Sequence, residues 1–501
     1  MPYSRIRDLT LGSLAAEHDQ ALENYFYESR MYHDVSRGRT KILIGNRGSG
    51  KSAIFKILAK KEKGQGTLVQ EITPTDFMYD LLTNTRQFDM NAEWARLGAY
   101  TTAWKYVMLV TAMRLLHGRY KKLKVEPEHV NRIKAFLRDH TEEHQCSPVD
   151  LLVLMLKKFA NVSRVSFEGI QFSDTATELD RLYKLNHLQP VIPSIQELSK
   201  HSRVLILFDE LDHGWDASDD ARQFIAGLFR AAIYINQHFS HLDVLVTIRE
   251  EIYQNIPELY DDAQKIRDII EHIRWTPEEL KMLISQRIKH AWENLLEKRL
   301  NVRDPDRLWE MIFEPYMNDG KTSTFDYIID HTLYRPRELI FFVNECLKVH
   351  NLETRIGQAT IEKVMRGYSK NRLDDIAAEY KFQYPGLREV FETFRLSDPI
   401  WNREQLEEHW LEIIEGIRQC PEASSWLNGT GFPNKLIEVL WKVGFLRVYM
   451  QWDASSVPES DVPAVGYFQE PTLNISMYNY FDIHPMFRPH LGIRNSFPQP
   501  N

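Results

Sequence analysis

Cysteine is scarce in this 501-residue sequence, which contains Cys146, Cys346 and Cys420 far apart from one another. Such spacing argues against a disulfide framework and against a cysteine zinc site. A run of about twenty apolar residues, which a membrane-spanning helix requires, is also missing. The first twenty residues carry acidic side chains and lack the basic-then-apolar order of a secretory signal. We therefore expect a cytoplasmic protein that is not attached to a membrane.

Several catalytic motifs are absent as well. The sequence has no HExxH pair and no clustered set of carboxylates and histidines, so it indicates no metal enzyme other than one that uses Mg²⁺ with a nucleotide. It has no GxSxG elbow that would present a serine nucleophile. A guanine-reading NKxD motif is also missing, which favours ATP over GTP.

Excess positive charge is absent too. The chain carries 62 Lys and Arg against 70 Asp and Glu, a formal net charge of -8, so it offers no global attraction to nucleic acid. Hydrophobic residues make up 43% of the chain, which is enough for a sizeable core. Because 501 residues exceed what one core usually organises, we expect a nucleotide-binding domain and smaller domains.

A phosphate-binding motif follows the first strand-like segment. The octet that fits GxxxxGK[ST] consists of Gly45, Asn46, Arg47, Gly48, Ser49, Gly50, Lys51 and Ser52. Its glycines let backbone N–H groups surround phosphates, Lys51 reaches the β and γ oxygens, and Ser52 ligates Mg²⁺. An apolar run over 41–44 precedes the octet, and a helical pattern over 52–61 and a second strand over 68–72 follow it. This order predicts a parallel βαβ unit.

Two carboxylates end a second buried strand. The unbroken apolar segment after Arg203 suits a central parallel strand, and it ends in Asp209 and Glu210. We expect Asp209 to hold Mg²⁺ and Glu210 to polarise the attacking water. A base beside the magnesium carboxylate predicts hydrolysis of the nucleotide.

Four further residues are candidates for contacts with the nucleotide. Thr247 ends the strand predicted over 244–248, and Arg249 follows it, so both are expected near the γ-phosphate at the carboxyl edge of the sheet. Arg335 and Arg337 open a helix in the segment YRPREL, where an arginine can stabilise charge during phosphoryl transfer. We favour Arg337 as this lid arginine, with Arg335 as the alternative.

The chain is expected to divide into five segments. Residues 1–92 and 200–275 form the two parts of an α/β ATPase core with a doubly wound parallel sheet. Residues 93–199 form a large helical insertion, because their apolar residues recur mostly at helical spacing. Residues 276–380 form a helical lid, which opens with a capping box from Thr276 to Glu279. Residues 381–501, helices followed by strands, suggest a winged-helix-like domain.

The order of these motifs resembles a known group of proteins. AAA-type and STAND-related P-loop ATPases, including origin-recognition-like ATPases with winged-helix tails, have motifs that resemble four segments of this chain. These segments are the octet 45–52, called the P-loop, DELDHGW (209–215), TIREEIY (247–253) and YRPREL (334–339). The LDxGW-type second motif and the RPR lid arginine resemble those of bacterial ATPases among mobile-element and phage-defence genes.

The resemblance implies the AAA-like P-loop NTPase fold and roles for individual residues. It implies phosphate binding by residues 45–52, a sensor at Thr247 and a lid arginine at Arg337. Ring assembly with an arginine finger is usual in this group. Arg249, Arg274 and Arg335 are alternative arginine fingers in this chain, and because none of them can be assigned, the homo-oligomeric state stays open.

Three functions are compatible with these features. The first is an ATP-hydrolysing switch for a protein partner, with antiviral defence suggested by the resemblance alone. The second is a DNA-dependent ATPase or loader, for which the basic segment 119–124 (RYKKLK) would be the foothold. The third is a non-hydrolysing scaffold, against which Glu210 argues. Residues 384–501 carry nine Lys and Arg against fifteen Asp and Glu, so we expect the tail to contact protein instead of DNA.

Overall fold

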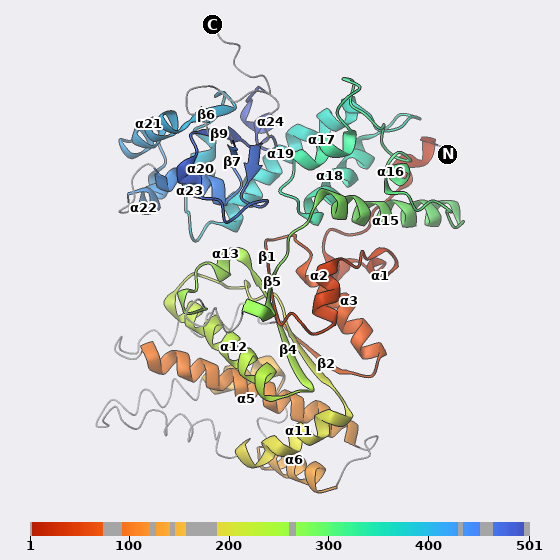
Figure 1. Cartoon of the computed structure of the whole chain (residues 1–501), viewed down its shortest axis with the longest axis vertical. Coiled ribbons are helices and arrows are strands. Elements are labelled where there is room, and N and C mark those ends of the chain that lie inside the picture. Colours follow the sequence, from red (N-terminus) through yellow and green to blue (C-terminus); the bar gives the residue numbers. More distant parts are fainter. Residues whose placement is uncertain are drawn as a thin grey trace. The chain divides into compact units, whose positions relative to one another are not determined.

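The computed structural model describes residues 3–73, 93–120, 127–140, 146–156, 188–259, 267–428, 434–450 and 464–494 (Figure 1). Two compact units make up the chain. The sheet unit comprises Glu28–Asn46 and Lys51–Ile273, and the C-terminal unit comprises Met1–Tyr27, Arg47–Gly50 and Arg274–Asn501. Within the described ranges no helix is both long and apolar enough to cross a membrane.

The sheet unit is built on a parallel five-stranded sheet. Its strands are β1 (Ile42–Gly45), β2 (Leu68–Ile72), β3 (Val204–Phe208), β4 (Leu242–Arg249) and β5 (Ile270–His272), in the order β2-β3-β4-β1-β5. The apolar runs of β1 and β3 are buried along their whole length, as expected for strands covered on both faces. The fold is therefore the α/β P-loop NTPase fold that the sequence predicts.

The register of the sheet brings the motif residues to one edge. Gly45 at the end of β1 pairs with Arg249 of β4, and Phe208 at the end of β3 pairs with Val246 of β4. Because all three strands are parallel, Asp209 follows directly beside Thr247. β4 lies between β1 and β3, so its polar end separates the P-loop from the two carboxylates.

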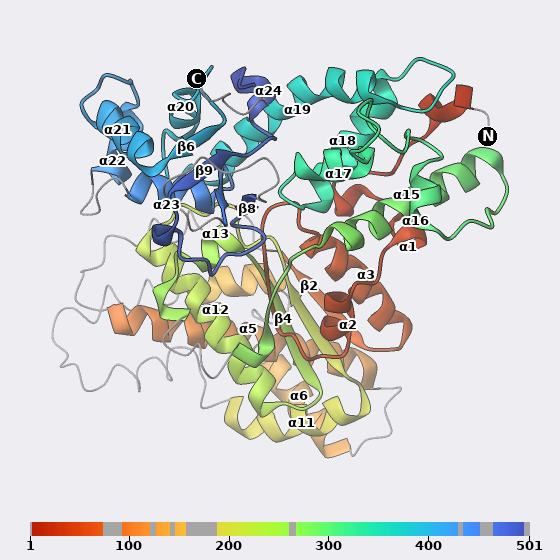
Figure 2. The same ribbon diagram turned by 45° about the horizontal axis from the view of Figure 1, so that its top comes forward.

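Helices cover both faces of the sheet. On one face, Ile206 and Val246 belong to a core with α5 (Glu93–Arg119) and α12 (Asp219–His238). On the other face, Leu205 and Leu245 line a small cavity with Leu58 of α3 (Lys51–Gly64). Figure 2 shows α3 beside β2. Adjacent residues of a strand point to opposite faces, so this arrangement is doubly wound.

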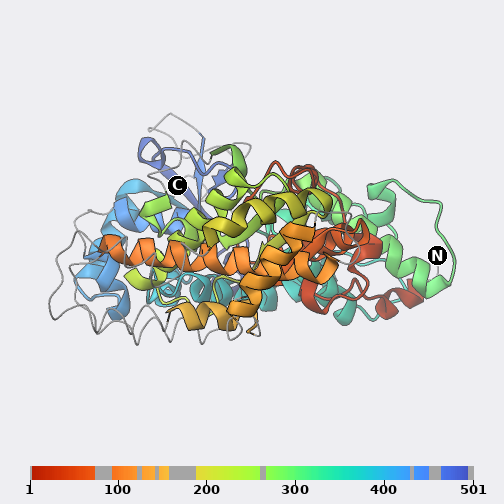
Figure 3. The same cartoon turned by 90° about the horizontal axis from the view of Figure 1, so that it is seen from below.

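The segment predicted as an insertion begins with a helix of the core. α5 runs against α12 (Figure 3), and the close approach leaves no room for a side chain at Gly227 of α12, where a Cβ would lie 2.7 Å from the Cβ of Tyr100. The indole of Trp104 donates to the carbonyl of Phe224 at 3.1 Å. The described remainder includes α6 (Pro127–Asp139), a helix over 148–156 and α11 (Ile192–His201). The division of the chain into five segments stays a prediction.

The C-terminal unit contains the helices predicted as a lid. They are α15 (Pro277–Leu296), α16 (Pro305–Trp309), α17 (Thr324–Asp330), α18 (Pro336–Val349) and α19 (Gln358–Glu379). The structure contains the predicted capping box, in which Thr276 and Glu279 exchange hydrogen bonds between side chain and backbone. The same unit includes an N-terminal segment with the short helices η1 (Tyr3–Asp8) and α1 (Leu22–Tyr25), while α2 (Arg30–Ser36) belongs to the sheet unit.

The tail combines helices with a small antiparallel sheet. Its helices are α20 (Leu387–Glu392), α21 (Arg403–Ile414), α22 (Ser424–Leu427), α23 (Asn434–Lys442) and α24 (Arg488–Leu491). Its strands β6 (Ile400–Asn402), β7 (Leu446–Tyr449), β8 (Ala464–Gly466) and β9 (Tyr480–Ile483) run in the order β6-β9-β7-β8. Buried Asp482 of β9 pairs with Arg447 and Arg488. The pattern of helices followed by strands agrees with the sequence, whereas β6 was not predicted.

Candidate nucleotide-binding site

The predicted P-loop connects β1 to α3. Gly45 is the last residue of β1, and α3 begins at Lys51. Gly48 and Gly50 adopt φ values of +81° and +102°, which side-chain-bearing residues rarely adopt. A Cβ at Gly48 would also lie 2.9 Å from the Cβ of Arg337. Both glycines are therefore required by the loop conformation, and the backbone N–H groups at the start of α3 are available to an anion.

Lys51 is held by the backbone that precedes it. Its Nζ donates to the carbonyl of Gly45 at 2.6 Å and to that of Asn46 at 3.0 Å. Burial lowers the pKa of its ammonium group, while Glu251 and Asp209 act in the opposite direction. The role of Lys51 in binding phosphate oxygens stays a prediction from the sequence.

Asp209 and Thr247 lie together at the carboxyl edge of the sheet. The Thr247 hydroxyl and the backbone N–H of Glu210 (2.9 Å) both donate to Oδ1 of Asp209. These bonds fix the carboxylate and leave Oδ2 without a hydrogen-bond partner among the described residues. An oxygen so positioned suits Mg²⁺, which takes one or two carboxylates together with phosphate oxygens. Ser52 would supply the hydroxyl ligand from the first turn of α3.

Glu210 has an unusual backbone conformation. Its φ is +57°, in the left-handed region, although it is not glycine. A residue in this region costs about 1–3 kcal/mol, and such strain clusters at functional sites. Its carboxylate is partly exposed and lies 3.5 Å from Nε2 of His213.

Arg249 pairs with acidic side chains of its own unit. Its guanidinium contacts Asp212 and lies 3.6 Å from Glu251, which is buried. The sequence predicted Arg249 beside the γ-phosphate, and in the structure it pairs with Asp212 and Glu251. Its role with the nucleotide stays a prediction.

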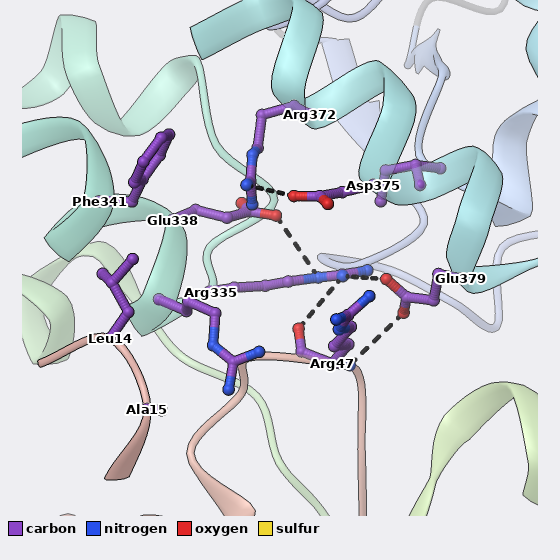
Figure 4. A pocket seen from close by; sticks show the side chains of 11 residues that line it. Leu14, Ala15, Arg47, Arg335, Glu338, Phe341, Arg372, Asp375 and Glu379 are labelled. Atoms are coloured by element: carbon purple, nitrogen blue, oxygen red, sulfur yellow. Dashed lines mark hydrogen bonds and ion pairs between the residues drawn. The ribbon is translucent and has the colours of Figure 1, made fainter. Parts of the chain in front are cut away.

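Arg335 and Arg337 hold the backbone of the P-loop in different ways. The backbone N–H of Arg337 donates to the carbonyl of Gly48 at 3.3 Å. The Arg335 side chain donates to the carbonyl of Arg47 at 3.3 Å and to Glu379 at 2.7 Å (Figure 4). Glu379 in turn accepts from the N–H of Arg47 at 3.4 Å. Both backbone groups of Arg47 are therefore held by one buried ion pair.

Three residues of this arrangement were not predicted from the sequence. Trp275 donates from its indole to the carbonyl of Ser49 at 2.8 Å. Glu379 and Asp212 are the partners of Arg335 and Arg249. Asp212 stands three residues after Asp209, and this spacing was an available signal. Glu379 carries no local signal, because its partner Arg47 lies 332 positions away in the sequence.

Metal ligands in the described part of the chain are limited. No group of three or more His, Cys, Asp or Glu side chains there could hold a metal ion by itself. A Mg²⁺ ion at Ser52 and Asp209 would therefore need oxygen ligands from the phosphates, which is its usual mode of binding.

Comparisons with known proteins give one family match and distant relatives. A family described as the FunZ-associated C-terminal helical domain matches residues 278–377, which correspond to α15–α19. The chain is 24% identical over 454 residues to a protein of Escherichia coli (strain K12) named "Putative transposon gamma-delta 80.3 kDa protein", covering 87% of this chain and 61% of that protein. The chain thus spans about three fifths of this relative's length.

Further similarities are shorter or weaker. Allergen Alt a 2 of Alternaria alternata is 26% identical over 141 residues, or 28% of this chain and 70% of that protein. The solved Aeropyrum pernix ORC2 protein in its ADPNP-ADP complexes is 11% identical, with a TM-score of 0.35 and coverage of 94% and 96% of the two chains. Its ADP form is 14% identical, with a TM-score of 0.28 and coverage of 91% and 87%.

Proposed function

We propose that the chain is an ATPase that binds ATP through residues 45–52 and hydrolyses it at the carboxyl edge of the parallel sheet. The observation that carries this proposal is the set of Lys51, Asp209, Glu210 and Thr247 at the carboxyl edge of the sheet. Lys51 begins the helix that follows β1, Asp209 and Glu210 follow β3, and Thr247 lies near the end of β4. A cation for phosphate, a fixed carboxylate and a second carboxylate for water are the parts that phosphoryl transfer needs.

Each residue has a distinct task in the proposed reaction. Lys51 exchanges the carbonyls of Gly45 and Asn46 for β and γ phosphate oxygens. Asp209, fixed by Thr247, holds Mg²⁺ together with Ser52, and the ion neutralises charge on the phosphates. Glu210 accepts a proton from the attacking water. Thr247 positions Asp209 and lies next to the water.

The lid arginine is assigned to Arg337. The backbone N–H of Arg337 donates to the Gly48 carbonyl, which supports a position of this residue next to the P-loop, and the Arg335 side chain holds Glu379 and the Arg47 carbonyl. We therefore assign Arg337 to charge stabilisation and Arg335 to positioning of the loop. This choice keeps the preference drawn from the sequence.

We propose that ATP binding and hydrolysis change the conformation of the chain and that a protein partner binds one of the conformations. The acidic tail favours this role, since phosphate neutralisation by Lys and Arg dominates affinity for nucleic acid. We propose a winged-helix-like fold for the tail on the basis of its four-stranded antiparallel sheet and its helices. The name of the Escherichia coli relative supports a mobile-element setting, and phage defence is the alternative setting.

A DNA-dependent ATPase is the second candidate. The transposon name of the same relative favours it. The basic segment 119–124 that the sequence offered as a foothold lies largely outside the described residues, because 121–126 are not described.

Phosphate release from ATP separates the two candidates. The full chain and its Lys51→Ala variant are assayed with and without duplex and single-stranded DNA, at low and high salt. Lys51-dependent turnover that is indifferent to DNA supports the protein-partnered switch. Lys51-dependent turnover that DNA stimulates at low salt only supports the DNA-dependent ATPase.

A further inference from the structure

A second cavity lies within the C-terminal unit. Its volume is about 310 Å³, at the lower end of the range for small-molecule sites. It is formed by α18, α19, the N-terminal segment at Leu14 and Ala15, and Arg47 (Figure 4). Neither Lys51 nor Ser52 lines it, and neither of the carboxylates at 209 and 210 does. Arg47 of the P-loop and the lid arginine Arg337 do line it, so the cavity adjoins the P-loop without including Lys51.

A buried arginine and a largely buried one, Arg335 and Arg372, line this cavity. The side chains of Arg335 and Arg372 are 8% and 12% exposed, and the Nε of each has no hydrogen-bond partner among the described residues, although the Nε of Arg335 lies 3.8 Å from Oε1 of Glu338 in an ion pair. One terminal nitrogen of each is held by a carboxylate, since Nη1 of Arg335 donates to Glu379 and Nη2 of Arg372 donates to Asp375. A guanidinium held in this way is a preorganised donor for an oxyanion.

The charge of the lining favours an anion. The lining includes three carboxylates, Glu338, Asp375 and Glu379, and four guanidinium groups, which belong to Arg47, Arg335, Arg337 and Arg372. The Arg47 side chain is exposed and has no ion pair or hydrogen bond within the described part of the chain. One positive charge is thus left over at the mouth of the cavity.

The rest of the wall is apolar. Leu14 and Ile376 line the cavity together with Phe341, whose ring lies 5.3 Å from the guanidinium carbon of Arg372. A ligand that matches both parts of the lining carries an oxyanion and a compact apolar or aromatic group. Several guanidinium groups suit a dianionic phosphate better than a carboxylate, because phosphate offers three acceptor oxygens.

We propose that this cavity binds a small organic phosphate monoester beside the P-loop, without a contact to Lys51. The phosphate lies among the arginines, and the organic group packs against Phe341 and Ile376. The Arg335 guanidinium that faces the ligand also holds the carbonyl of Arg47, so the ligand and the P-loop share one side chain.

Binding of phenyl phosphate to the full chain tests the proposal, with isothermal titration calorimetry as the readout. Inorganic phosphate and benzoate are the comparison probes. Phenyl phosphate is expected to bind one per chain, and Lys51→Ala is expected to change its Kd by less than about twofold. Arg372→Gln should weaken binding by about tenfold or more. Arg366→Gln, at an exposed position of the same helix, is the matched control and should leave binding unchanged.

Each alternative result overturns part of the proposal. Absence of binding at millimolar probe overturns it outright, and loss of binding in Lys51→Ala assigns the probe to the P-loop instead. Benzoate that binds as tightly as phenyl phosphate overturns the phosphate assignment, and inorganic phosphate that binds as tightly overturns the role of the apolar wall. If Arg372→Gln fails to fold, the exposed Arg47→Gln serves in its place. Because the readout is binding, the result does not depend on whether the chain hydrolyses ATP.

Discussion

Removal of the Arg335 side chain should destabilise the C-terminal unit strongly. The variant Arg335→Met leaves the carboxylates of Glu338 and Glu379 without their cation, and both are 2% exposed. Breaking a buried ion pair in this way costs about 3–5 kcal/mol. For a unit of this size, each 1 kcal/mol lowers the melting temperature by about 2–4 °C. We therefore expect a decrease on the order of 10 °C.

The pH dependence of this loss has a defined sign. Burial raises the pKa of Glu338 even with Arg335 present, and loss of the cation raises it further. An acid whose pKa is higher in the folded state binds more protons when folded, so its contribution to stability falls as pH rises. The destabilisation by Arg335→Met should therefore be larger at pH 8 than at pH 5.5.

Scanning calorimetry of a double-mutant cycle measures the ion pair itself. Arg335→Met, Glu379→Met and the double variant are compared, with Arg366→Met as a surface control on α19. We expect the free energy of unfolding of the double variant to be about 1–3 kcal/mol higher than the value obtained by adding the two single losses. Additivity within about 0.5 kcal/mol, or a melting temperature of Arg335→Met within 2 °C of the parent chain, would refute the reasoning.

Three further predictions concern the P-loop, a helix start and acid stability. Gly48→Ala should weaken ATP binding by about tenfold or more, because the new Cβ meets Arg337 at a φ of +81°, whereas Gly64→Ala, with open space around it, should not. Thr276→Ala should lower unfolding free energy by about 0.5–2 kcal/mol through loss of the capping box, and Thr276→Ser should retain most of it. Burial lowers the pKa of His409 to about 4, so below pH 6.5 the unfolded state binds more protons than the folded state. The free energy of unfolding should therefore fall as pH falls from 6.5 towards 4, by roughly 2 kcal/mol at pH 5. Urea unfolding across this range should show the decrease, and the decrease should be smaller in His409→Gln.

Long apolar runs made much of the sheet predictable from the sequence. β2 has the predicted bounds, and β3 and β4 contain the predicted runs, because central parallel strands are buried on both faces. The capping box at Thr276 was equally predictable, since its residues stand three positions apart. β5 was missed because it has three residues and its middle one, Glu271, is exposed.

Long-range pairing was beyond reach of a single sequence. The partnership of Glu379 with Arg335 and Arg47 depends on the packing of α18 and α19, and no local spacing encodes it. The helical pattern of α5 was recognised from the sequence, but its packing in the core was not. That packing depends on the close approach of α5 to Gly227 of α12. The cavity near Arg372 is likewise a product of tertiary packing.

The central claim is that Lys51 binds ATP phosphates and Glu210 activates the water that cleaves ATP. The most direct measurement combines ATP binding and phosphate release for the full chain, Lys51→Ala and Glu210→Gln. We predict that Lys51→Ala loses both ATP binding and turnover. Glu210→Gln should bind ATP normally, and its rate of phosphate release should be lower by about 10²-fold or more. Unchanged turnover in either variant would contradict the account.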